Sequence, residues 1–308
     1  MSFCSKVTNG LRLVYDYQFR WLYLASFGKY NDWDDEAFLK KAFECHMGKK
    51  LNLDNPKTFN EKIQWLKLHD RKPEYTMMVD KYAVRKYIAD TIGEEYLIPL
   101  LGVWDNPDDI DFDALPNQFV LKCNHNSGLG MCICKDKSKL DIDKIKAELR
   151  KGLQQDYYLT GRECPYKNVK RRIIAEKYMT TLGMDDLPDY KIHCFNGEPK
   201  FILYCSERFS KTGTKEDFLD TNWSKLPFKR PDLKCSDKIL KKPSRLNEML
   251  ELAKILSTNV PFLRCDFYEI KGNVYFGELT FFPASGLEAF EPEEWDYKLG
   301  DWLELPRN

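Results

Sequence analysis

The chain has 308 residues, more than one small domain needs, so we expect two lobes or one large mixed domain. Lysine plus arginine and aspartate plus glutamate each number 48, and the resulting formal charge of zero provides no global field to recruit nucleic acid. The sequence shows no signal peptide after Met1 and no apolar run of about 18 residues or more, so we expect a cytoplasmic protein without a membrane-spanning helix.

The first part of the chain, residues 1–75, is expected to form a helical appendage. Apolar spacing predicts two helices within residues 11–47, separated near residues 28–35. Thr58 and Glu61 form a capping-box pattern that starts a further helix. The aromatic-rich stretch 11–27 leaves two readings open: an interfacial helix at the inner face of a membrane, or a helix packed on the protein itself or on a partner.

A hairpin with a glycine-containing turn is predicted over residues 119–134, after a helix at 80–90 and a buried strand at 96–104. The polar turn includes Ser127, Gly128 and Gly130, and Lys122 lies on the strand that precedes it. Backbone N–H groups of such a turn can close over phosphate oxygens, to which a strand lysine adds positive charge. An ordinary β-turn with a solvated lysine is the alternative, because the pattern is not that of a Walker loop.

The second half of the chain is predicted to contain mainly strands. A lysine-rich helical region at 135–159 precedes a strand at 171–179 and a hairpin at 187–204 that turns at Asn196-Gly197. Residues 207–243 have weak periodicity and are interpreted as a loop or an insertion. Ser244 is expected to cap a helix at 245–256.

The last predicted hairpin, within residues 262–286, carries charges where apolar residues are the rule. Asp266 and Glu278 lie on its two arms, so their carboxylates can converge. Convergent oxygen donors suit a Mg²⁺ ion that bridges nucleotide phosphates. The structural alternative is that Arg264 pairs with one of these carboxylates, and the sequence leaves both readings open.

Several motifs together resemble the ATP-grasp superfamily and, more narrowly, its TupA-like group, which is associated with bacterial surface polysaccharides. They are NLDNPKTFNEK at 52–62, DKYAVR at 80–85, FVLK at 119–122, IAEKY at 174–178, DYK at 189–191, and Arg264-x-Asp266 followed by Glu278-Leu-Thr280. The resemblance implies an α+β fold in which two lobes grip ATP. It further implies an appendage at 1–75, a core at 76–290 with a lid at about 115–180, and a tail at 291–308.

The resemblance also implies a role for each matching residue. Binding of ATP phosphates is assigned to Lys81 and Lys122, with Ser127, Gly128 and Gly130 as the phosphate lid. Adenine pairing is assigned to Glu176, Lys177, Tyr178 and Met179, and ribose binding to Asp189. Catalytic contact with the transferred phosphoryl group is assigned to Lys191 and Arg264, and Mg²⁺ binding to Asp266, Glu278 and Thr280. Most ATP-grasp enzymes have Asn where this chain has Thr280, so this third ligand departs from the pattern.

The implied activity is an ATP-dependent carboxylate–amine ligase that works through an acyl phosphate. Its expected partners are ATP, a uronic-acid carboxylate on a glycan or sugar nucleotide, and a small amine such as an amino acid or amino alcohol. Two alternatives are a glycosyltransferase, for which Asp111-Phe-Asp113 and Asp141-Ile-Asp143 match an Asp-x-Asp pattern, and an ATP-dependent phosphotransferase. A third is a non-catalytic binding module, against which the retained lysines and carboxylates argue.

Overall fold

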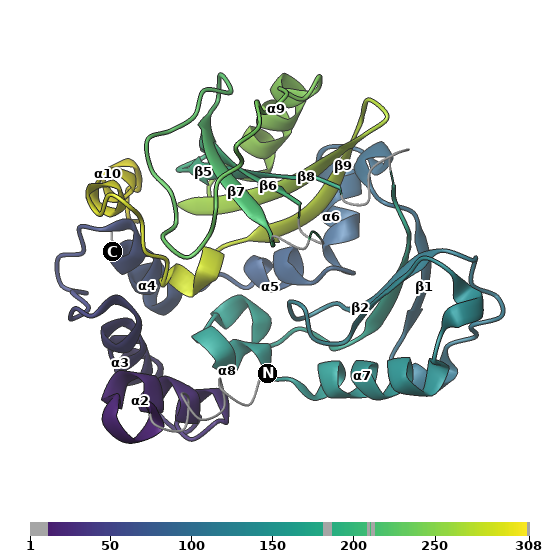
Figure 1. Ribbon diagram of the computed structural model, residues 1–308, viewed down its shortest axis with the longest axis horizontal. Coiled ribbons are helices and arrows are strands. Elements are labelled where there is room, and N and C mark those ends of the chain that lie inside the picture. The colour runs from purple at the N-terminus through teal and green to yellow at the C-terminus, as the bar shows by residue number, and fades with distance from the viewer. Residues whose placement is uncertain (1–11, 181–186, 208–209, 211–212, 307–308) are drawn as a thin grey trace.

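The computed structural model describes residues 12–180, 187–207, 210 and 213–306. Two antiparallel sheets dominate the fold, and helices cover their outer faces (Figure 1). The strands are β1 Leu100–Trp104, β2 Phe119–Cys123, β3 Met131–Cys134, β4 Ile173–Lys177, β5 Asp189–Phe195, β6 Glu198–Ser206, β7 Lys215–Asp220, β8 Phe262–Ile270 and β9 Asn273–Thr280. The α-helices are α2 Tyr17–Ser26, α3 Asp35–Met47, α4 Phe59–His69, α5 Glu74–Val79, α6 Val84–Thr91, α7 Ile142–Gln154, α8 Tyr157–Gly161, α9 Leu246–Leu256 and α10 Glu294–Trp302.

The smaller sheet has the strand order β1-β4-β2-β3. The predicted hairpin of β2 and β3 is confirmed, with Phe119 opposite Cys134 and Lys122 opposite Met131. Alternate residues of β2 are buried beneath α7, as a strand with one covered face requires. The prediction of a buried strand at 96–104 was wrong in two respects. The strand begins at Leu100, after a 3₁₀ turn at Glu94–Tyr96, and it forms a half-exposed edge because it pairs with β4 alone.

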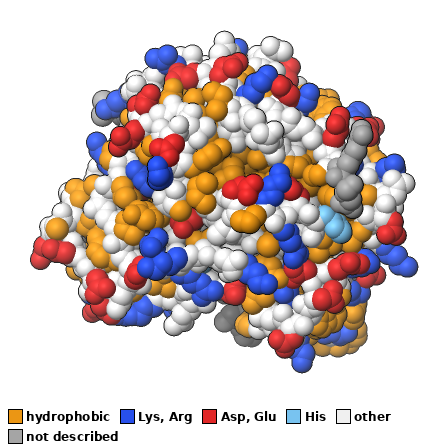
Figure 2. Space-filling view, turned by 180° about the vertical axis from the view of Figure 1, so that it is seen from behind, with side chains coloured by type: hydrophobic (Ala, Val, Ile, Leu, Met, Phe, Trp, Pro, Cys, Tyr) orange, Lys and Arg blue, Asp and Glu red, His pale blue; other side chains and the backbone are white. Residues whose placement is uncertain are grey.

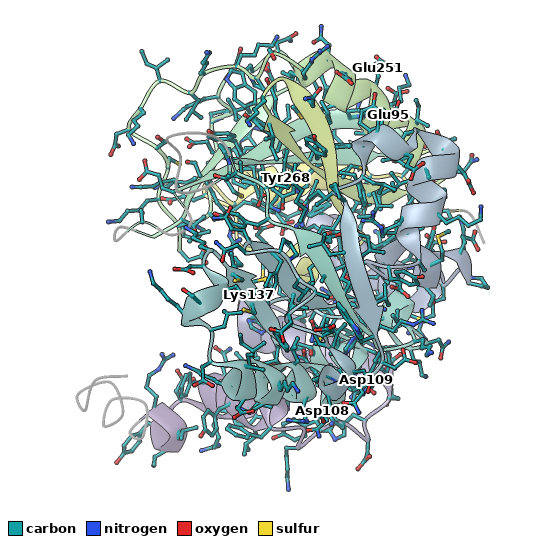
Figure 3. All side chains as sticks on the ribbon, turned by 90° about the vertical axis from the view of Figure 1, so that its right-hand side faces the viewer. Glu95, Asp108, Asp109, Lys137, Glu251 and Tyr268 are labelled. Carbon is teal, nitrogen blue, oxygen red and sulfur yellow. The ribbon has the colours of Figure 1, made fainter. Side chains whose placement is uncertain are left out.

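The larger sheet has the strand order β7-β6-β5-β8-β9, and α9 covers one of its faces (Figure 1). Both predicted hairpins are confirmed, β5–β6 and β8–β9. Their turns place Asn196-Gly197 and Lys271-Gly272 in the left-handed region, as two-residue hairpin turns require. Figure 3 shows this sheet from the side, with Tyr268 of β8 in the upper layer and Lys137 and Asp108 in the layer of the smaller sheet.

Two local predictions in the second half of the chain were wrong. Residues 207–243 contain β7, an edge strand of the larger sheet, and are not wholly loop. Its apolar pattern is hidden because Asp217 occupies a buried position, where Lys225 pairs with it at 2.8 Å. Ser244 does not cap α9: its hydroxyl donates to Glu269 at 2.5 Å, and the helix begins after Arg245 without a side-chain cap.

The helices of the N-terminal region fall into two groups. Helices α2 and α3, predicted within 11–47, form a small core of their own around Trp21 and Phe43. Helix α4 begins at the predicted capping box of Thr58 and Glu61, and its apolar side joins the core of the larger sheet. Helix α10 packs against α4 in that same core. The domain boundaries at 75 and 290 stay predictions, but the packing connects α4 and α10 to the larger sheet.

The aromatic stretch near the N-terminus has an exposed side. Tyr15, Tyr23 and Phe27 are exposed, while Trp21 stacks on Tyr30 with ring centroids 4.9 Å apart. None of the helices within 12–180, 187–207 and 213–306 is both long enough and apolar enough to span a bilayer. On the face shown in Figure 2, positive and negative side chains are interspersed around apolar ones.

Candidate active site

A set of seven ionisable side chains connects the inner faces of the two sheets, and we call it the ion network. Its members are Lys81, Lys122, Glu176, Lys191, Arg264, Asp266 and Glu278. In the larger sheet, Lys191, Asp266 and Glu278 lie directly opposite one another on three adjacent strands. Directly opposite residues of antiparallel strands point to the same face, so their side chains converge away from α9.

Arg264 is the centre of the network on the larger sheet. Its Nε and Nη2 atoms donate to the two carboxylate oxygens of Asp266, both at 2.7 Å, and Nη2 also donates to Glu278 at 3.0 Å. Lys191 Nζ lies 2.5 Å from the Asp266 carboxylate. A bidentate guanidinium pair of this kind is strong and geometrically specific. The predicted pairing of Arg264 with a carboxylate is therefore present, and it involves both carboxylates.

Burial and neighbouring charge act in opposite directions on this cluster. Burial alone would raise the pKa of Glu278, but the surrounding cations, Lys81 first, lower it to about 2. Burial alone would lower the pKa of Arg264, but Asp266 and Glu278 raise it above its ordinary value. Both groups therefore remain charged across the physiological pH range.

A β-bulge aims Glu278 at its partners. The β8–β9 register shifts between Asp266 and Phe267, so Gly277 is the extra residue next to Glu278. A Cβ atom on Gly277 would lie 3.0 Å from the carbonyl oxygen of Asp266 and 3.1 Å from the Tyr268 ring. The position therefore favours glycine, and the bulge lets the carboxylate face Asp266 across the hairpin.

The smaller sheet contributes a second cation–carboxylate group. Lys122 Nζ lies 2.6 Å from one oxygen of Glu176, and Arg85 lies 3.2 Å from the other. Arg85 also donates to the carbonyl oxygen of Ile98 at 2.9 Å, which fixes its guanidinium. Arg85 belongs to the DKYAVR motif, but the family resemblance implied no role for it. Its position four residues after Lys81 was the signal in the sequence that could have identified it.

Lys81 connects the two sheets. Its backbone N–H donates to Asn124 O at 3.0 Å, and its Nζ donates to Asn126 O at 2.8 Å, both in the turn after β2. The same Nζ lies 3.7 Å from Glu278 of β9. Burial lowers the pKa of Lys81, and Glu278 partly offsets this effect. One lysine therefore contacts both the glycine-containing turn and a predicted metal ligand.

The glycine-containing turn has a fixed base and an open tip. Asn124 anchors its base: the side chain donates to Asp80 at 2.7 Å, and its Oδ1 accepts from the Arg172 N–H at 2.7 Å. Gly130 packs against Gly152, where a Cβ atom would lie 2.9 Å from the Gly152 Cα. At the tip, Ser127 and Gly128 are exposed, and a Cβ on Gly128 would meet nothing within 4 Å.

The remaining predicted residues lie at the margins of the network. Asp189 lies 3.3 Å from Lys191 Nζ, and Thr280 is opposite Arg264 in the β8–β9 ladder. Lys177 donates its backbone N–H to Pro99 O, at the end of β4 where Tyr178 and Met179 continue the chain. The structure thus brings the predicted charged residues together, whereas their roles toward adenine, ribose and phosphate stay predictions.

The chemical type of the available donor atoms suits Mg²⁺. Asp266 and Glu278 supply carboxylate oxygens from facing strands, and Mg²⁺ in phosphate-transfer sites commonly uses one or two carboxylates together with phosphate oxygens. Within the described ranges, no three or more histidine, cysteine or acidic side chains are grouped so as to hold a metal ion by themselves. Two carboxylates completed by nucleotide phosphates therefore fit the residues present.

The two Asp-x-Asp matches have local structural roles. Asp111 Oδ1 accepts backbone N–H bonds from Asp113 and Ala114 in a turn. Asp141 is the N-cap of α7 and accepts from Lys144 N at 3.0 Å. Both aspartates therefore act as backbone caps, as such residues commonly do.

The sequence matches a known protein family. The family described as TupA-like ATPgrasp matches residues 61–304. This chain belongs to the TupA-like ATP-grasp family, and its two sheets form the ATP-grasp fold. No curated protein sequence matches the chain.

Similar solved structures are distant. They include D-alanine–D-alanine ligase from Bacillus anthracis complexed with ATP, with 18% identity, a TM-score of 0.43, and coverage of 74% of this chain and 65% of that one. The same ligase from Helicobacter pylori has 18% identity and a TM-score of 0.41, with 80% and 69% covered. The ATP-grasp ligase PsnB complexed with a minimal precursor has 10% identity and a TM-score of 0.38, with 72% and 59% covered. The chain thus spans about two thirds of the length of these proteins or less.

Proposed function

We propose that this protein is an ATP-dependent ligase that joins a carboxylate to an amine through an acyl phosphate. The observation that carries the proposal is the ion network, in which four cations and three carboxylates face one another between the two sheets. Transfer of a phosphoryl group requires cations at the phosphate oxygens and a metal at the developing charge, and no protein nucleophile. Membership of the ATP-grasp family supports this reading.

The proposed roles rest on the family motifs and are supported by the grouping of these residues in the ion network. Lys81 and Lys122 bind the ATP phosphates, and the turn with Ser127, Gly128 and Gly130 covers them. When bound, Mg²⁺ is held by Asp266 and Glu278 and neutralises charge on the phosphates. In this proposal Arg264 and Lys191 orient the transferred phosphoryl group toward the substrate carboxylate. The guanidinium of Arg264 must then give up part of its contact with Asp266 and Glu278.

The remaining ATP contacts are proposed at the margins of the network. Adenine pairs with the backbone after β4, in the segment Glu176, Lys177, Tyr178 and Met179, and Asp189 accepts from the ribose hydroxyls. Thr280 is a weaker third metal ligand in this proposal, because it provides a hydroxyl where related sites provide an amide oxygen. These roles rest on the family motifs at these positions.

The proposed substrates rest on the association of the TupA-like group with surface polysaccharides. A uronic-acid carboxylate on a glycan or sugar nucleotide is activated, and a small amine such as an amino acid or amino alcohol attacks it. The protein acts in the cytoplasm in this proposal. The exposed aromatic side chains of α2 and of the residue after it, Tyr17, Tyr23 and Phe27, are its candidate contact with a membrane surface or with an enzyme of polysaccharide synthesis.

The test measures ADP release by the full chain with ATP, Mg²⁺, an ¹⁸O-carboxylate-labelled uronate and an amine. A ligase releases ADP only when both substrates are present, and one labelled oxygen appears in inorganic phosphate. Label in AMP would indicate adenylation. A stable phosphorylated product without amide would indicate a phosphotransferase, and sugar transfer without ATP cleavage would indicate a glycosyltransferase. Each of these three outcomes contradicts the proposal.

A further inference from the structure

Exposed hydrophobic side chains gather near the N-terminus. Within the described residues, six of the thirteen large hydrophobic side chains that are exposed lie between positions 14 and 33. They are Val14, Tyr15, Tyr17, Tyr23, Phe27 and Trp33. Single exposed hydrophobic residues are common on soluble proteins, but a group of them marks a surface that binds a partner. Five of these six are aromatic, and aromatic rings concentrate at the boundary between lipid and water.

Helix α2 has one buried side and one exposed side. Trp21 is buried and contacts Phe38 of α3, with ring centroids 5.4 Å apart, whereas Tyr23 and Phe27 are 42% and 73% exposed. Phe19, Tyr23 and Phe27 follow one another at intervals of four residues, and neighbouring rings lie 6.4 and 4.9 Å apart between centroids. These three rings therefore form an aromatic stripe along the outer side of the helix. Figure 1 shows α2 at the edge of the molecule, with α3 between it and α4.

The charges along this stretch are mainly positive, in a protein whose total formal charge is zero. Residues 12–31 contain the cations Arg12, Arg20 and Lys29 but a single carboxylate, Asp16. Asp16 is the N-cap of α2: it accepts a backbone N–H of the first turn at 2.9 Å and a guanidinium N–H of Arg12 at 3.1 Å. Its charge is therefore compensated within the helix, and the surface as a whole favours an anionic partner.

A groove that we call the basic groove lies beside this helix, along α3. Its volume is about 370 Å³, and its lining includes Trp33, Lys40, Lys41, Glu44, Lys50 and Leu51. The first two lysines and the glutamate belong to α3, and the third lysine follows the end of that helix. The lining therefore combines an excess of positive charge with an exposed indole ring.

Two of the lysines in the basic groove form ion pairs that an outside anion can replace. Lys41 pairs with Glu44 at 2.7 Å, and Lys40 pairs with Glu36 at 2.6 Å. In both pairs the partners are three or four residues apart on α3 and are open to solvent. Ion pairs of this kind are weak, because water and salt screen the charges. An anionic group that contacts two or three of the lysines at once can therefore displace the carboxylates.

The basic groove and the exposed rings belong to one continuous surface. The ammonium group of Lys41, in the groove, lies 4.7 Å from the centre of the Tyr17 ring of α2. Trp33, also in the groove, lies 6.1 Å from Trp21 of α2 between ring centroids. Ammonium groups and aromatic rings are therefore direct neighbours where α2 packs on α3.

The composition of this surface fits a lipid bilayer better than it fits another protein. Protein interfaces are rich in aromatic residues but depleted of lysine. A bilayer with anionic phospholipids binds both kinds of side chain: the rings enter the boundary between headgroups and acyl chains, and the cations contact the phosphates. A helix as short as α2, with an aromatic outer side, suits a position in the plane of the membrane surface.

We propose that helices α2 and α3 bind the surface of a membrane that contains anionic phospholipids. The aromatic stripe of Phe19, Tyr23 and Phe27 enters the headgroup layer, with α2 parallel to the membrane plane. The basic groove holds the phosphate of a lipid headgroup through its lysines. Of the two contacts named above for α2, this inference selects the membrane and adds a headgroup site on α3. It does not require the ligase activity, because the surface binds lipid whatever reaction the ion network catalyses.

The test measures binding of the full chain to lipid vesicles by co-sedimentation. Vesicles of phosphatidylcholine with phosphatidylglycerol should bind the protein, vesicles of phosphatidylcholine alone should bind it weakly, and added salt should weaken the binding. The double variant Tyr23→Ala/Phe27→Ala removes two exposed rings and should lower the partition coefficient at least about tenfold, the loss expected when one buried ring is removed. Tyr297→Ala, which removes an exposed ring of α10, is the matched control.

Substitution of lysines in the basic groove tests the headgroup site. Lys40→Gln/Lys50→Gln should lower binding to vesicles with phosphatidylglycerol about fivefold for each lysine, and should leave binding to phosphatidylcholine alone unchanged. Lys86→Gln, at an exposed lysine of α6, is the control for loss of charge. Inorganic phosphate at constant ionic strength should not release the protein from the vesicles. Release by inorganic phosphate would show that the groove binds a free anion and would overturn the lipid site.

The outcomes separate this inference from the proposed function. Loss of vesicle binding in Tyr23→Ala/Phe27→Ala, with binding retained in Tyr23→Trp/Phe27→Trp, supports the membrane surface. Unchanged binding in the alanine variant, or no binding of the wild type, would overturn it. A wild-type dimer that the alanine variant abolishes, without vesicle binding, would show that a second copy covers the stripe and would overturn it too. ADP release with galacturonic acid, ethanolamine and ATP should be equal in the alanine variant and the wild type, so either proposal can fail without the other.

Discussion

The turn at residues 124–130 contacts Lys81 of the ion network, and the turn at Pro283–Gly286 follows β9, the strand that carries Glu278. Both use left-handed backbone. They differ in what surrounds them. At Gly128, in the first turn, an added Cβ would meet nothing within 4 Å, whereas at Gly286 it would lie 2.4 Å from Ile63 and 2.7 Å from Gln64. The first turn has an exposed tip with open space around Gly128. The second is held from behind by a helix and can keep a side chain in one place.

The comparison shows that one fold can contain a turn with few contacts and a turn that is held firmly in place. In the proposed function the first turn is a phosphate lid, which must open and close and therefore needs few contacts at its tip. The turn at Pro283–Gly286 is instead held by buried hydrogen bonds from α4, which keep its strained backbone in place. The predictions that follow test each half of this contrast, beginning with the largest expected effect.

Removal of the buried ammonium should strongly destabilise the second turn. Lys67→Met leaves Gly161 O and the two Ser285 oxygens without their donor. Each buried acceptor left without a donor costs about 1–3 kcal/mol of the free energy of unfolding. Urea denaturation measures this loss. Lys298→Met is the control, because the exposed pair of Lys298 with Glu294 should contribute less than about 1 kcal/mol. Equal effects of the two variants would contradict the contrast.

The lysine before the first turn should affect activity and not stability. Lys122 is half-buried and pairs with Glu176 at 2.6 Å. If Lys122 binds ATP phosphate, Lys122→Ala should lower ATP-dependent turnover about 10²- to 10³-fold, as loss of one electrostatic contact in a transition state does. Steady-state ADP release measures the effect, and circular dichroism checks the fold. Lys139→Ala, in the same region but exposed, should behave as wild type. Unchanged ATP affinity and turnover in Lys122→Ala would remove this residue from the site.

The two turns can be compared by the same change, glycine to alanine, made in each of them. Gly128→Ala and Gly286→Ala both place a side chain in left-handed backbone, which costs about 1–2 kcal/mol. Only Gly286→Ala also forces a Cβ into Ile63 and Gln64, which adds about 1–3 kcal/mol of overpacking. Thermal or urea unfolding should therefore rank Gly286→Ala as clearly less stable. If both variants lose the same stability, the second turn is not held as described.

The carboxylate after the second turn should make stability depend on pH. Burial raises the pKa of Glu288 from 4.5 to about 7, although Arg230 pairs with it at 3.0 Å. Between these pH values the folded protein retains a proton that the unfolded chain has lost. Stability should therefore fall as pH rises from 4.5 to 7, by an amount on the order of 1–3 kcal/mol.

Glu288→Gln isolates this contribution. The variant cannot titrate at this position, so its free energy of unfolding should lose that part of the slope between pH 4.5 and 7. Glu293→Gln, at an exposed carboxylate, should keep the wild-type slope. A wild-type slope in Glu288→Gln would show that Glu288 is ionised throughout this range.

The local features of the fold could be predicted from sequence because their causes lie within a few residues. Asn196-Gly197 and Lys271-Gly272 determine their turns through left-handed backbone, and Thr58 with Glu61 determines the start of α4. Strand β7 was not predicted, because the cause of its burial lies outside its own residues. Its burial depends on a lysine and on a neighbouring strand, and its own residues are polar at one end.

The family motifs identified the charged residues but not their connections. Asp266 and Glu278 were expected to converge, and the hairpin register places them opposite each other. That Arg264 binds both carboxylates, and that Lys81 reaches Glu278 from the turn after β2, required the three-dimensional structure. These contacts join segments distant in the chain, so no spacing rule indicates them.

The sequence by itself determined the hairpins, the capped helices and the set of charged residues. These features depend on the backbone preferences of residues that are close in the chain and on motif spacing. The tertiary structure alone decided which of these residues share a site. Asn60, Gln64 and Lys67 look like the polar side of an ordinary helix, yet they are buried against a turn more than 200 residues away. Burial makes polar groups require partners, and only the packed fold determines which partners are within reach.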